Sequence, residues 1–227
     1  DKKPGVCPDD PESPVLMASL DVNSGPVHEM ILDLVHRHVA ITSTLPVLEM
    51  GAFTGRPTLQ KRLLDALSPD ARSTLLWRRV QSTDTAYLRK RYGSDVSPEP
   101  AVFRKELEFE YAFVQAGGLL LAGADPTGMG GVVAGFADQR ELELLVEAGF
   151  TPVQAIHIAT ENGAEYLGEA DRVGTIAAGK QADLVVVKGN PAGKIEDVEN
   201  VEIVFKDGIG YDSQKLFDSV RGVVGSR

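Results

Sequence analysis

This chain of 227 residues has little cysteine, no long apolar run and no cluster of basic residues. Its one cysteine, Cys7, excludes an internal disulfide. No stretch approaches the roughly 20 apolar residues that a membrane-spanning helix needs. The 23 basic and 33 acidic residues give a net charge of −10, and the basic ones form no long run that could follow nucleic-acid phosphates. We therefore expect a protein that binds neither membrane nor nucleic acid.

The first residues carry no targeting signal. The chain starts at Asp1 rather than at methionine, without the basic region and apolar segment of a signal peptide. Four prolines and several acids in residues 1–14 predict an irregular segment. With 43% hydrophobic residues, the chain is long enough to bury one sizeable core. We expect it to be soluble, and cytoplasmic rather than exported.

The segment LLLAGADPTG at residues 119–128 is the most informative part of the sequence. The run that starts at Leu119 has no polar residue before Gly123, which is typical of a parallel strand covered on both faces. Asp125 follows where such a strand ends. Because α/β folds and barrels bind ligands at the carboxyl ends of their strands, Asp125 is the first candidate for a functional residue.

Hydrophobic periodicity and turn residues predict an alternating α/β chain that changes character near residue 174. The expected helices are 26–37, 99–116, 139–148, 151–167 and 213–220, with less regular helical patches at 59–67 and 71–80. The expected strands are 39–45, 119–124, 182–187 and 201–206. The last two no longer alternate with long helices, which indicates a small β module beside the α/β part.

Four motifs together resemble the C-terminal half of an amidohydrolase-superfamily enzyme. They are GADPTG with Asp125, the helix pair at 141–168, RVGTIAAGKQADLVVVKGNP at 172–191 and VEIVFKDG at 201–208. The most similar group is the imidazolonepropionase-like and Xaa-Pro-dipeptidase-like metal-dependent hydrolases. Residues 28–49 also resemble the helix and strand that precede barrel strand 8 in that family.

The resemblance implies part of a (β/α)₈ TIM barrel, about strands 7 and 8, with a small β-sandwich. It assigns residues 1–170 to the barrel, 171–212 to a composite β-sandwich module and 213–227 to a closing helix and tail. A complete barrel needs eight βα units and about 250 residues. We therefore interpret the chain as a C-terminal fragment whose partner is the missing N-terminal half or a second copy of itself.

The family resemblance also implies one or two divalent metals, most often zinc. The family's ligands are an H-x-H pair on strand 1, a lysine or acid on strand 4, histidines on strands 5 and 6, and the aspartate of strand 8. Only the last has a counterpart here, Asp125, so most ligands are absent from this chain. The sole H-x-H, His36-Arg37-His38, follows a helix at the wrong end of the unit, and we expect it to be a solvent-facing loop pair.

Other candidate residues have weaker support. Thr42, Ser43 and Thr44, at the end of a predicted strand, and Thr127, after Asp125, are candidates for substrate contact, although alternate strand residues face opposite ways and only some of the first three can face it. The Gly-rich segment 128–131 lacks the phosphate-binding spacings and is expected to be a plain loop. His28 and His157 lie in helical patterns, and we expect both to be partly buried structural residues.

Two further groups have structural interpretations. Lys180 and Asp183 resemble the family's tight turn into a sandwich strand, so we expect them to be structural. The aromatic residues of two predicted helices are expected to pack helix faces. They are Trp77, Phe103, Phe109, Tyr111 and Phe113.

The implied activity is hydrolysis of a C–N bond in a small amide, cyclic amide or dipeptide. A metal lowers the pKa of its bound water to about 7, and a neighbouring carboxylate can move the proton to the leaving nitrogen. Asp125 would be that carboxylate and a metal ligand. From the pattern alone, Asp125 equally fits a turn cap that accepts backbone N–H groups. The alternative function is a catalytically silent fragment that acts only in structural association. A nucleotide binder is disfavoured by the missing phosphate motifs.

Overall fold

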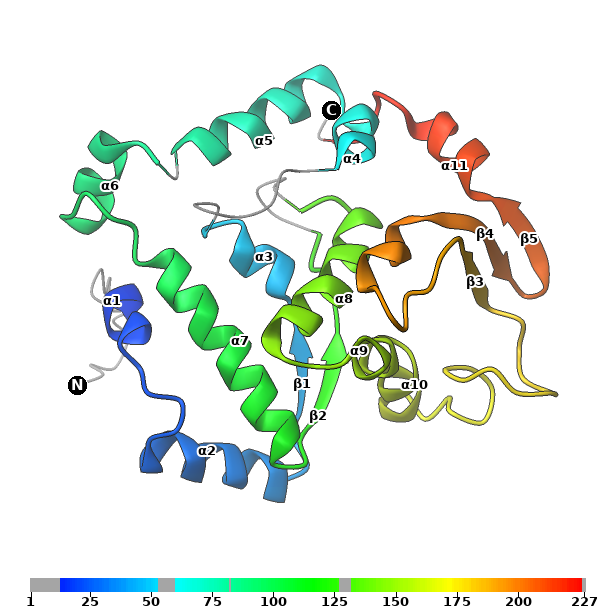
Figure 1. Cartoon of the computed structure of the whole chain (residues 1–227), viewed down its shortest axis with the longest axis horizontal. Helices are drawn as coiled ribbons and strands as arrows, with labels where there is room; N and C mark the ends of the chain where they lie inside the picture. Colours follow the sequence, from blue (N-terminus) through cyan, green and yellow to red (C-terminus); the bar gives the residue numbers. More distant parts are fainter. Residues whose placement is uncertain (1–12, 53–59, 82, 127–131, 226–227) are drawn as a thin grey trace, which may run out of the picture.

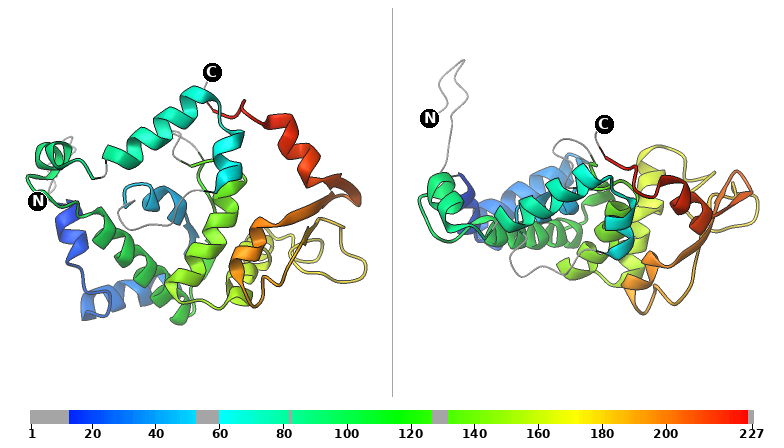
Figure 2. Two further views of the ribbon diagram at one scale, coloured as in Figure 1. Left: turned by 45° about the horizontal axis from the view of Figure 1, so that its top comes forward. Right: turned by 90° about the horizontal axis from the view of Figure 1, so that it is seen from above.

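The computed structural model describes residues 13–52, 60–81, 83–126 and 132–225. At its centre, two short parallel strands are packed against helices, and a separate three-stranded antiparallel sheet follows near the C-terminus (Figure 1). The antiparallel sheet lies at the opposite end of the molecule from α6 (Figure 2). The α/β class that the sequence predicts is confirmed.

The central strands are β1 (Ala40–Ser43) and β2 (Leu119–Ala122). They are parallel, and their register pairs Ala40 with Leu119 and Ser43 with Ala122. One more hydrogen bond follows the paired residues, from the amide of Gly123 to the carbonyl of Ser43, at 2.9 Å. Both strands fall within the predicted ranges but are shorter. β1 ends at Ser43 because the chain enters a helix at Leu45.

The described residues between β1 and β2 form five helices. They are α3 (Leu45–Glu49), α4 (Lys61–Ala66), α5 (Pro69–Gln81), α6 (Thr85–Tyr92) and α7 (Glu99–Gln115). The prediction for α7 is confirmed, and α4 and α5 fall on the two helical patches. Local signals explain α3 and α6, the two helices of this region that the sequence did not predict. Pro46 lies in the first turn of α3, while Asp84 caps α6 and Gly93 ends it with φ +67°.

Between β2 and β3, the described residues form helices α8 (Phe136–Ala148), α9 (Pro152–Ala159) and α10 (Glu161–Tyr166). The capping box predicted at Thr151 is present: its hydroxyl accepts from the Gln154 amide, and Gln154 accepts from the Thr151 amide. The single helix expected over 151–167 is wrong. It breaks at Thr160, whose backbone is not helical and whose hydroxyl donates to the carbonyl of Ile156 at 2.7 Å.

At the N-terminal side, α1 (Ser13–Ala18) and α2 (Gly25–His36) precede β1. The expected irregular segment lies mainly within residues 1–12, outside the described part. His36 and His38 are both exposed where α2 meets β1, at the amino end of the strand. The interpretation of this H-x-H as a solvent-facing pair is confirmed.

The C-terminal part contains β3 (Leu184–Val187), a 3₁₀ turn η1 (Ile195–Glu199), β4 (Val201–Lys206), β5 (Ile209–Asp212) and α11 (Ser213–Val220). The three strands form an antiparallel sheet in the order β3-β4-β5. Asp207 and Gly208 both have positive φ, as a tight hairpin turn between β4 and β5 requires. The prediction did not extend past this turn to β5.

Lys180 and Asp183 stabilise the entry to this sheet. The Lys180 ammonium donates to the carbonyl of Ala170 at 2.6 Å, and Asp183 accepts from the amide of Asp207 at 2.8 Å. Both side chains therefore bind neighbouring turns, as their structural interpretation predicts.

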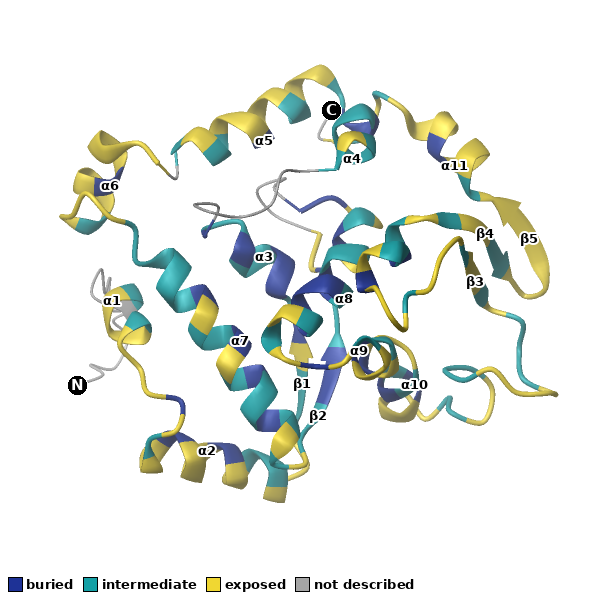
Figure 3. Ribbon diagram, viewed as in Figure 1, coloured by how far each residue is buried: buried dark blue, intermediate teal, exposed yellow. Residues whose placement is uncertain are grey.

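The main core lies between the strand pair and helices α7, α8 and α9 (Figure 3). Leu120, Leu144 and Leu145 have no exposed surface, and Phe103 of α7 joins the same cluster. The expected packing of the α7 aromatic residues is confirmed. Trp77 is different: its side chain is 58% exposed, so its expected packing against a helix face is wrong.

Among the described residues, no helix has both the length and the apolar character needed to cross a bilayer.

Replacement of Leu144 by alanine should lower the free energy of unfolding by about 2–5 kcal/mol, because it removes a fully buried side chain from the main core. Chemical denaturation would measure this loss. The matched control is Leu167→Ala, since Leu167 is 72% exposed and its truncation should have little effect. Equal losses for the two variants would contradict the assignment of the core.

Candidate functional site

The candidate site is the carboxyl edge of the parallel strand pair. Since β1 and β2 run in the same direction and in register, the residues that follow them emerge at one edge (Figure 1). Thr44 comes directly after β1 and is half-buried. Gly123 follows β2, and a Cβ atom there would lie 2.8 Å from Thr42 Cγ2. Glycine at this position therefore lets the two strand ends approach each other.

Asp125 is exposed at this edge and has a strained backbone. Its φ is +40°, a region that residues other than glycine seldom adopt and that aspartate tolerates better than most. Such strain persists only where the surrounding structure imposes it, and it is concentrated in turns and functional sites. The geometry is thus compatible with both interpretations from the sequence, the turn and the functional carboxylate.

A cavity of about 220 Å³ lies behind this edge, between the end of β2 and helices α8 and α9. Gly123, Asp138, Glu141 and Thr160 line it together with apolar side chains. Asp138 accepts from the amide of Gly135 at 3.0 Å and so caps α8. The cavity is smaller than the roughly 300–1,000 Å³ of drug-sized ligand pockets, and it fits only a small group.

Two buried carboxyl groups meet at the hydroxyl of Ser43, behind the edge. Ser43 has no exposed surface, and its hydroxyl donates to Glu110 Oε2 of α7 at 2.9 Å. Glu141 of α8 is 1% exposed, and neither of its carboxyl oxygens has a hydrogen bond within the described residues. The Ser43 proton is donated to Glu110, and Glu141 lies close to this second acid, with the Ser43 hydroxyl and the Leu45 backbone near its carboxyl group.

Burial controls the ionisation of both acids. It raises the pKa of Glu141 to about 8, an effect that the nearby Ser43 hydroxyl opposes and the charge of Glu110 increases. Burial also raises the pKa of Glu110 to about 7, against the hydrogen bond from Ser43. Both acids therefore keep their protons to a higher pH than an exposed glutamate does.

Sequence reasoning missed Glu110 and Glu141, although a signal was present. Each acid interrupts an apolar stripe at helical spacing: Glu110 follows Phe103 and Leu107, and Glu141 precedes Leu144 and Leu145. An acid on the buried face of an amphipathic helix is costly unless it is protonated or paired.

The other predicted residues lie apart from this edge. Thr127 and the Gly-rich segment 128–131 are outside the described residues. His28 and His157 are exposed, so their expected partial burial is wrong; each lies on the outer surface of a helix, and His157 Nδ1 is 2.9 Å from Glu161. In the described part of the chain, no group of three or more His, Cys, Asp or Glu side chains could hold a metal ion.

Stability should fall as the pH rises from about 4.5 to about 8. Glu141 ionises near its ordinary value of 4.5 in the unfolded chain but near 8 in the folded one, so the unfolded state loses its proton first. Each unit of pKa difference corresponds to about 1.4 kcal/mol. Glu141→Gln should therefore stabilise the protein above pH 7, relative to the original chain, and change it little at pH 4.

Denaturant midpoints across this pH range would measure the effect. The matched control is Glu165→Gln, which removes a carboxylate from an exposed position on α10. If Glu141→Gln and the original chain lost stability in parallel between pH 4.5 and 8, the raised pKa of Glu141 would be contradicted.

Comparison with known proteins gives one family. Residues 111–209, which contain β2 and Asp125, match the model of the amidohydrolase family. The adenine deaminase of Ligilactobacillus salivarius (strain UCC118) is 40% identical over 67 residues, which make up 30% of this chain and 11% of that protein. This chain therefore spans only a small part of its curated relative.

Solved structures share the fold over most of the chain. The crystal structure of an amidohydrolase aligns with 82% of this chain and 37% of its own length, with a TM-score of 0.55 and 21% identity. The ochratoxinase of A. niger aligns with 84% of this chain and 35% of its own length, with a TM-score of 0.51 and 21% identity. Residues 111–209 are thus similar to the amidohydrolase family, and the solved structures share the fold over most of the chain.

Proposed function

We propose that this chain supplies one edge of a hydrolase that cleaves a C–N bond in a small amide, cyclic amide or dipeptide, with Asp125 as the group that carries the proton. The observation behind the proposal is the position of Asp125. It follows β2 at the carboxyl edge of a parallel strand pair, within the segment that matches the amidohydrolase family. That edge is where enzymes with parallel α/β architecture bind their substrates.

The wider architecture in this proposal is part of a TIM barrel, with β1 and β2 as about strands 7 and 8. Three features support it: the strands are parallel, helices lie between and after them, and the solved relatives are more than twice as long as the aligned part. Residues 171–212, with β3, β4 and β5, would form the β-sandwich module. The rest of the barrel would come from a missing N-terminal half, or the open strand pair would drive self-association.

In this site Asp125 would act first as general base and then as general acid. Its carboxylate would take the proton of the attacking water and return it to the nitrogen that leaves. Thr44, at the end of β1, is positioned at the same edge and would contact the substrate, as would Thr127. Glu141 and Glu110 do not face the substrate in this scheme; they support the strand ends from behind through Ser43.

The family generally uses a divalent metal, zinc being our expectation. The described residues do not fit a complete metal site, because Asp125 has no second and third ligand beside it. Any such ligands would come from another part of the assembled enzyme. The alternative function, structural association without catalysis, predicts no dependence of activity on Asp125.

Asp125→Asn in the assembled enzyme should lower kcat by at least the roughly 10²- to 10⁴-fold that general acid–base catalysis contributes, because asparagine keeps the shape and cannot exchange the proton. Asparagine also tolerates the positive φ at this position. Turnover of amide and dipeptide substrates would be measured. Asp171→Asn, the same change in an exposed turn, is the matched control and should leave kcat unchanged. Activity of Asp125→Asn within a few-fold of the original would reassign Asp125 as a turn residue.

The 227-residue chain by itself should not retain stoichiometric zinc after dialysis against a chelator. Structural and catalytic zinc sites need three or four protein ligands, and the described residues bring no such group together. Elemental analysis of the dialysed protein would measure the metal. Retention of one zinc per chain would contradict this expectation, and the double variant His36→Ala, His38→Ala would then test whether the H-x-H pair holds it.

A further inference from the structure

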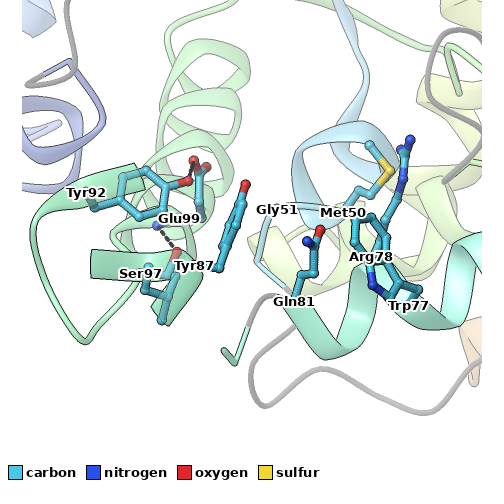
Figure 4. Close-up of a pocket in the computed structure, with 10 residues that line it drawn as sticks. Met50, Gly51, Trp77, Arg78, Gln81, Tyr87, Tyr92, Ser97 and Glu99 are labelled. Atoms are coloured by element: carbon cyan, nitrogen blue, oxygen red, sulfur yellow. Dashed lines mark hydrogen bonds between the residues drawn. The ribbon is translucent and has the colours of Figure 1, made fainter. Parts of the chain in front are cut away.

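A second pocket, of about 290 Å³, lies in the helical segment that connects β1 to α7, which we call the excursion. The end of α3, helices α5 and α6, and the start of α7 form its walls (Figure 4). No residue of the strand edge lines it. Its volume is near the lower limit of small-molecule pockets and suits a ligand of about one ring.

Aromatic rings form two sides of this pocket. Trp77 of α5 and Tyr87 of α6 both line it, and their side chains are 58% and 38% exposed. In Figure 4, Tyr87 stands between Glu99 on one side and Gln81, with Met50 beyond it, on the other. Large rings left exposed around a cavity provide apolar area and π faces for a ligand.

A carboxylate is held in place at one end of the pocket. Glu99, at the start of α7, accepts a hydrogen bond from the Tyr92 hydroxyl at 2.7 Å. Burial and this hydrogen bond raise the pKa of Tyr92 to about 12, so the phenol stays a donor to Glu99 across the physiological range. Gly51 faces the carboxylate, and a Cβ there would lie 3.2 Å from Glu99 Oε2. Glycine thus leaves the space beside the acid open.

The two cationic side chains described near the pocket, Arg78 and Arg91, do not occupy the end at Glu99, so a ligand can bind there. Arg78 lines the wall, but its guanidinium is directed away from Tyr87 and Glu99 (Figure 4). Arg91 lies over the Tyr92 ring, 5.5 Å from its centroid. An aromatic ring of this pocket therefore already holds a cation, the kind of contact that the faces of Tyr87 and Trp77 offer.

We propose that this pocket binds a small organic cation, a protonated primary amine that carries one ring or a short branched alkyl group. The ammonium would lie against Glu99, and the apolar part would pack between Tyr87 and Trp77. A carboxylate and aromatic faces together select positive charge with an apolar body. The net charge of −10 favours the approach of a cation over that of an anion.

The test uses the fluorescence of Trp77, which is the only tryptophan in the sequence and lines the pocket. Benzylamine, protonated at neutral pH, would be titrated into the 227-residue chain. The expected result is saturable quenching with a shift of the emission to shorter wavelength. Benzyl alcohol and benzoate, which match benzylamine in size, should bind at least tenfold more weakly. Equal binding of either compound, or no saturable change with benzylamine, would overturn the proposal.

Two variants locate the site. Glu99→Gln keeps the shape and removes the charge, and it should weaken benzylamine binding by roughly tenfold, the factor that one charged hydrogen bond gives. Tyr87→Leu should also weaken it. The matched control is Tyr166→Leu, because Tyr166 is an exposed ring on α10 that does not line the pocket. Circular dichroism would verify the folding of each variant.

Unchanged affinity in both pocket variants would overturn the assignment even if one of them lost stability. Asp125→Asn should bind benzylamine as the original chain does. The titration measures binding and not hydrolysis. Failure of benzylamine to bind and failure of the proposed catalytic role of Asp125 are therefore separate results.

Discussion

The parallel register of β1 and β2 is the constraint on which the rest of the structure depends. It places Ser43 beside Ala122, and the bond from the Gly123 amide continues the pairing to the carboxyl edge. Backbone groups of two such short strands cannot hold this arrangement alone, because an isolated strand pair is at best marginally stable in water. Side chains of α7, α8 and α9 cover the strands and make the register the lowest-energy one, since a slip by one residue would turn Leu120 out of the core.

The same helices bring acids as well as apolar groups to the strands. Glu110 and Glu141 approach Ser43 from two different helices, and an ion pair between Arg140 and Glu49 connects α8 to α3. Arg140 donates two hydrogen bonds to Glu49, and both side chains are only partly exposed. This bidentate geometry fixes the orientation of the two side chains and also stabilises their contact. The carboxyl edge thus rests on polar contacts that depend on protonation, and the apolar core lies deeper along the strands.

Much of the fold could be predicted from local sequence. The ends of α7, the capping box at Thr151 and the turn at Asp207 each follow from residues whose backbone preferences are strong. The break at Thr160 was not predicted, because the sequence pattern on both sides is helical and the bond from its hydroxyl to the Ile156 carbonyl is visible only in the structure.

The candidate site was predictable in part. The position of Asp125 after a buried strand could be predicted, because an apolar run stops at an acid within ten residues. The cluster around Ser43 joins residues 67 positions apart through a hydrogen bond, and no local pattern specifies which helices will meet there. The pocket at Trp77 was missed for a related reason. An aromatic residue on a helix most often packs inward, and only the three-dimensional arrangement of α3, α5, α6 and α7 shows that this ring lines a cavity.

The excursion that leaves the sheet after Ser43 and returns through α7 has an evolutionary consequence. Its two ends are held by the strand pair, so a change in its length alters the closure entropy only logarithmically, by about 0.6 kcal/mol for each doubling. Homologous chains can therefore differ in the length of this region while the register of β1 and β2 stays the same.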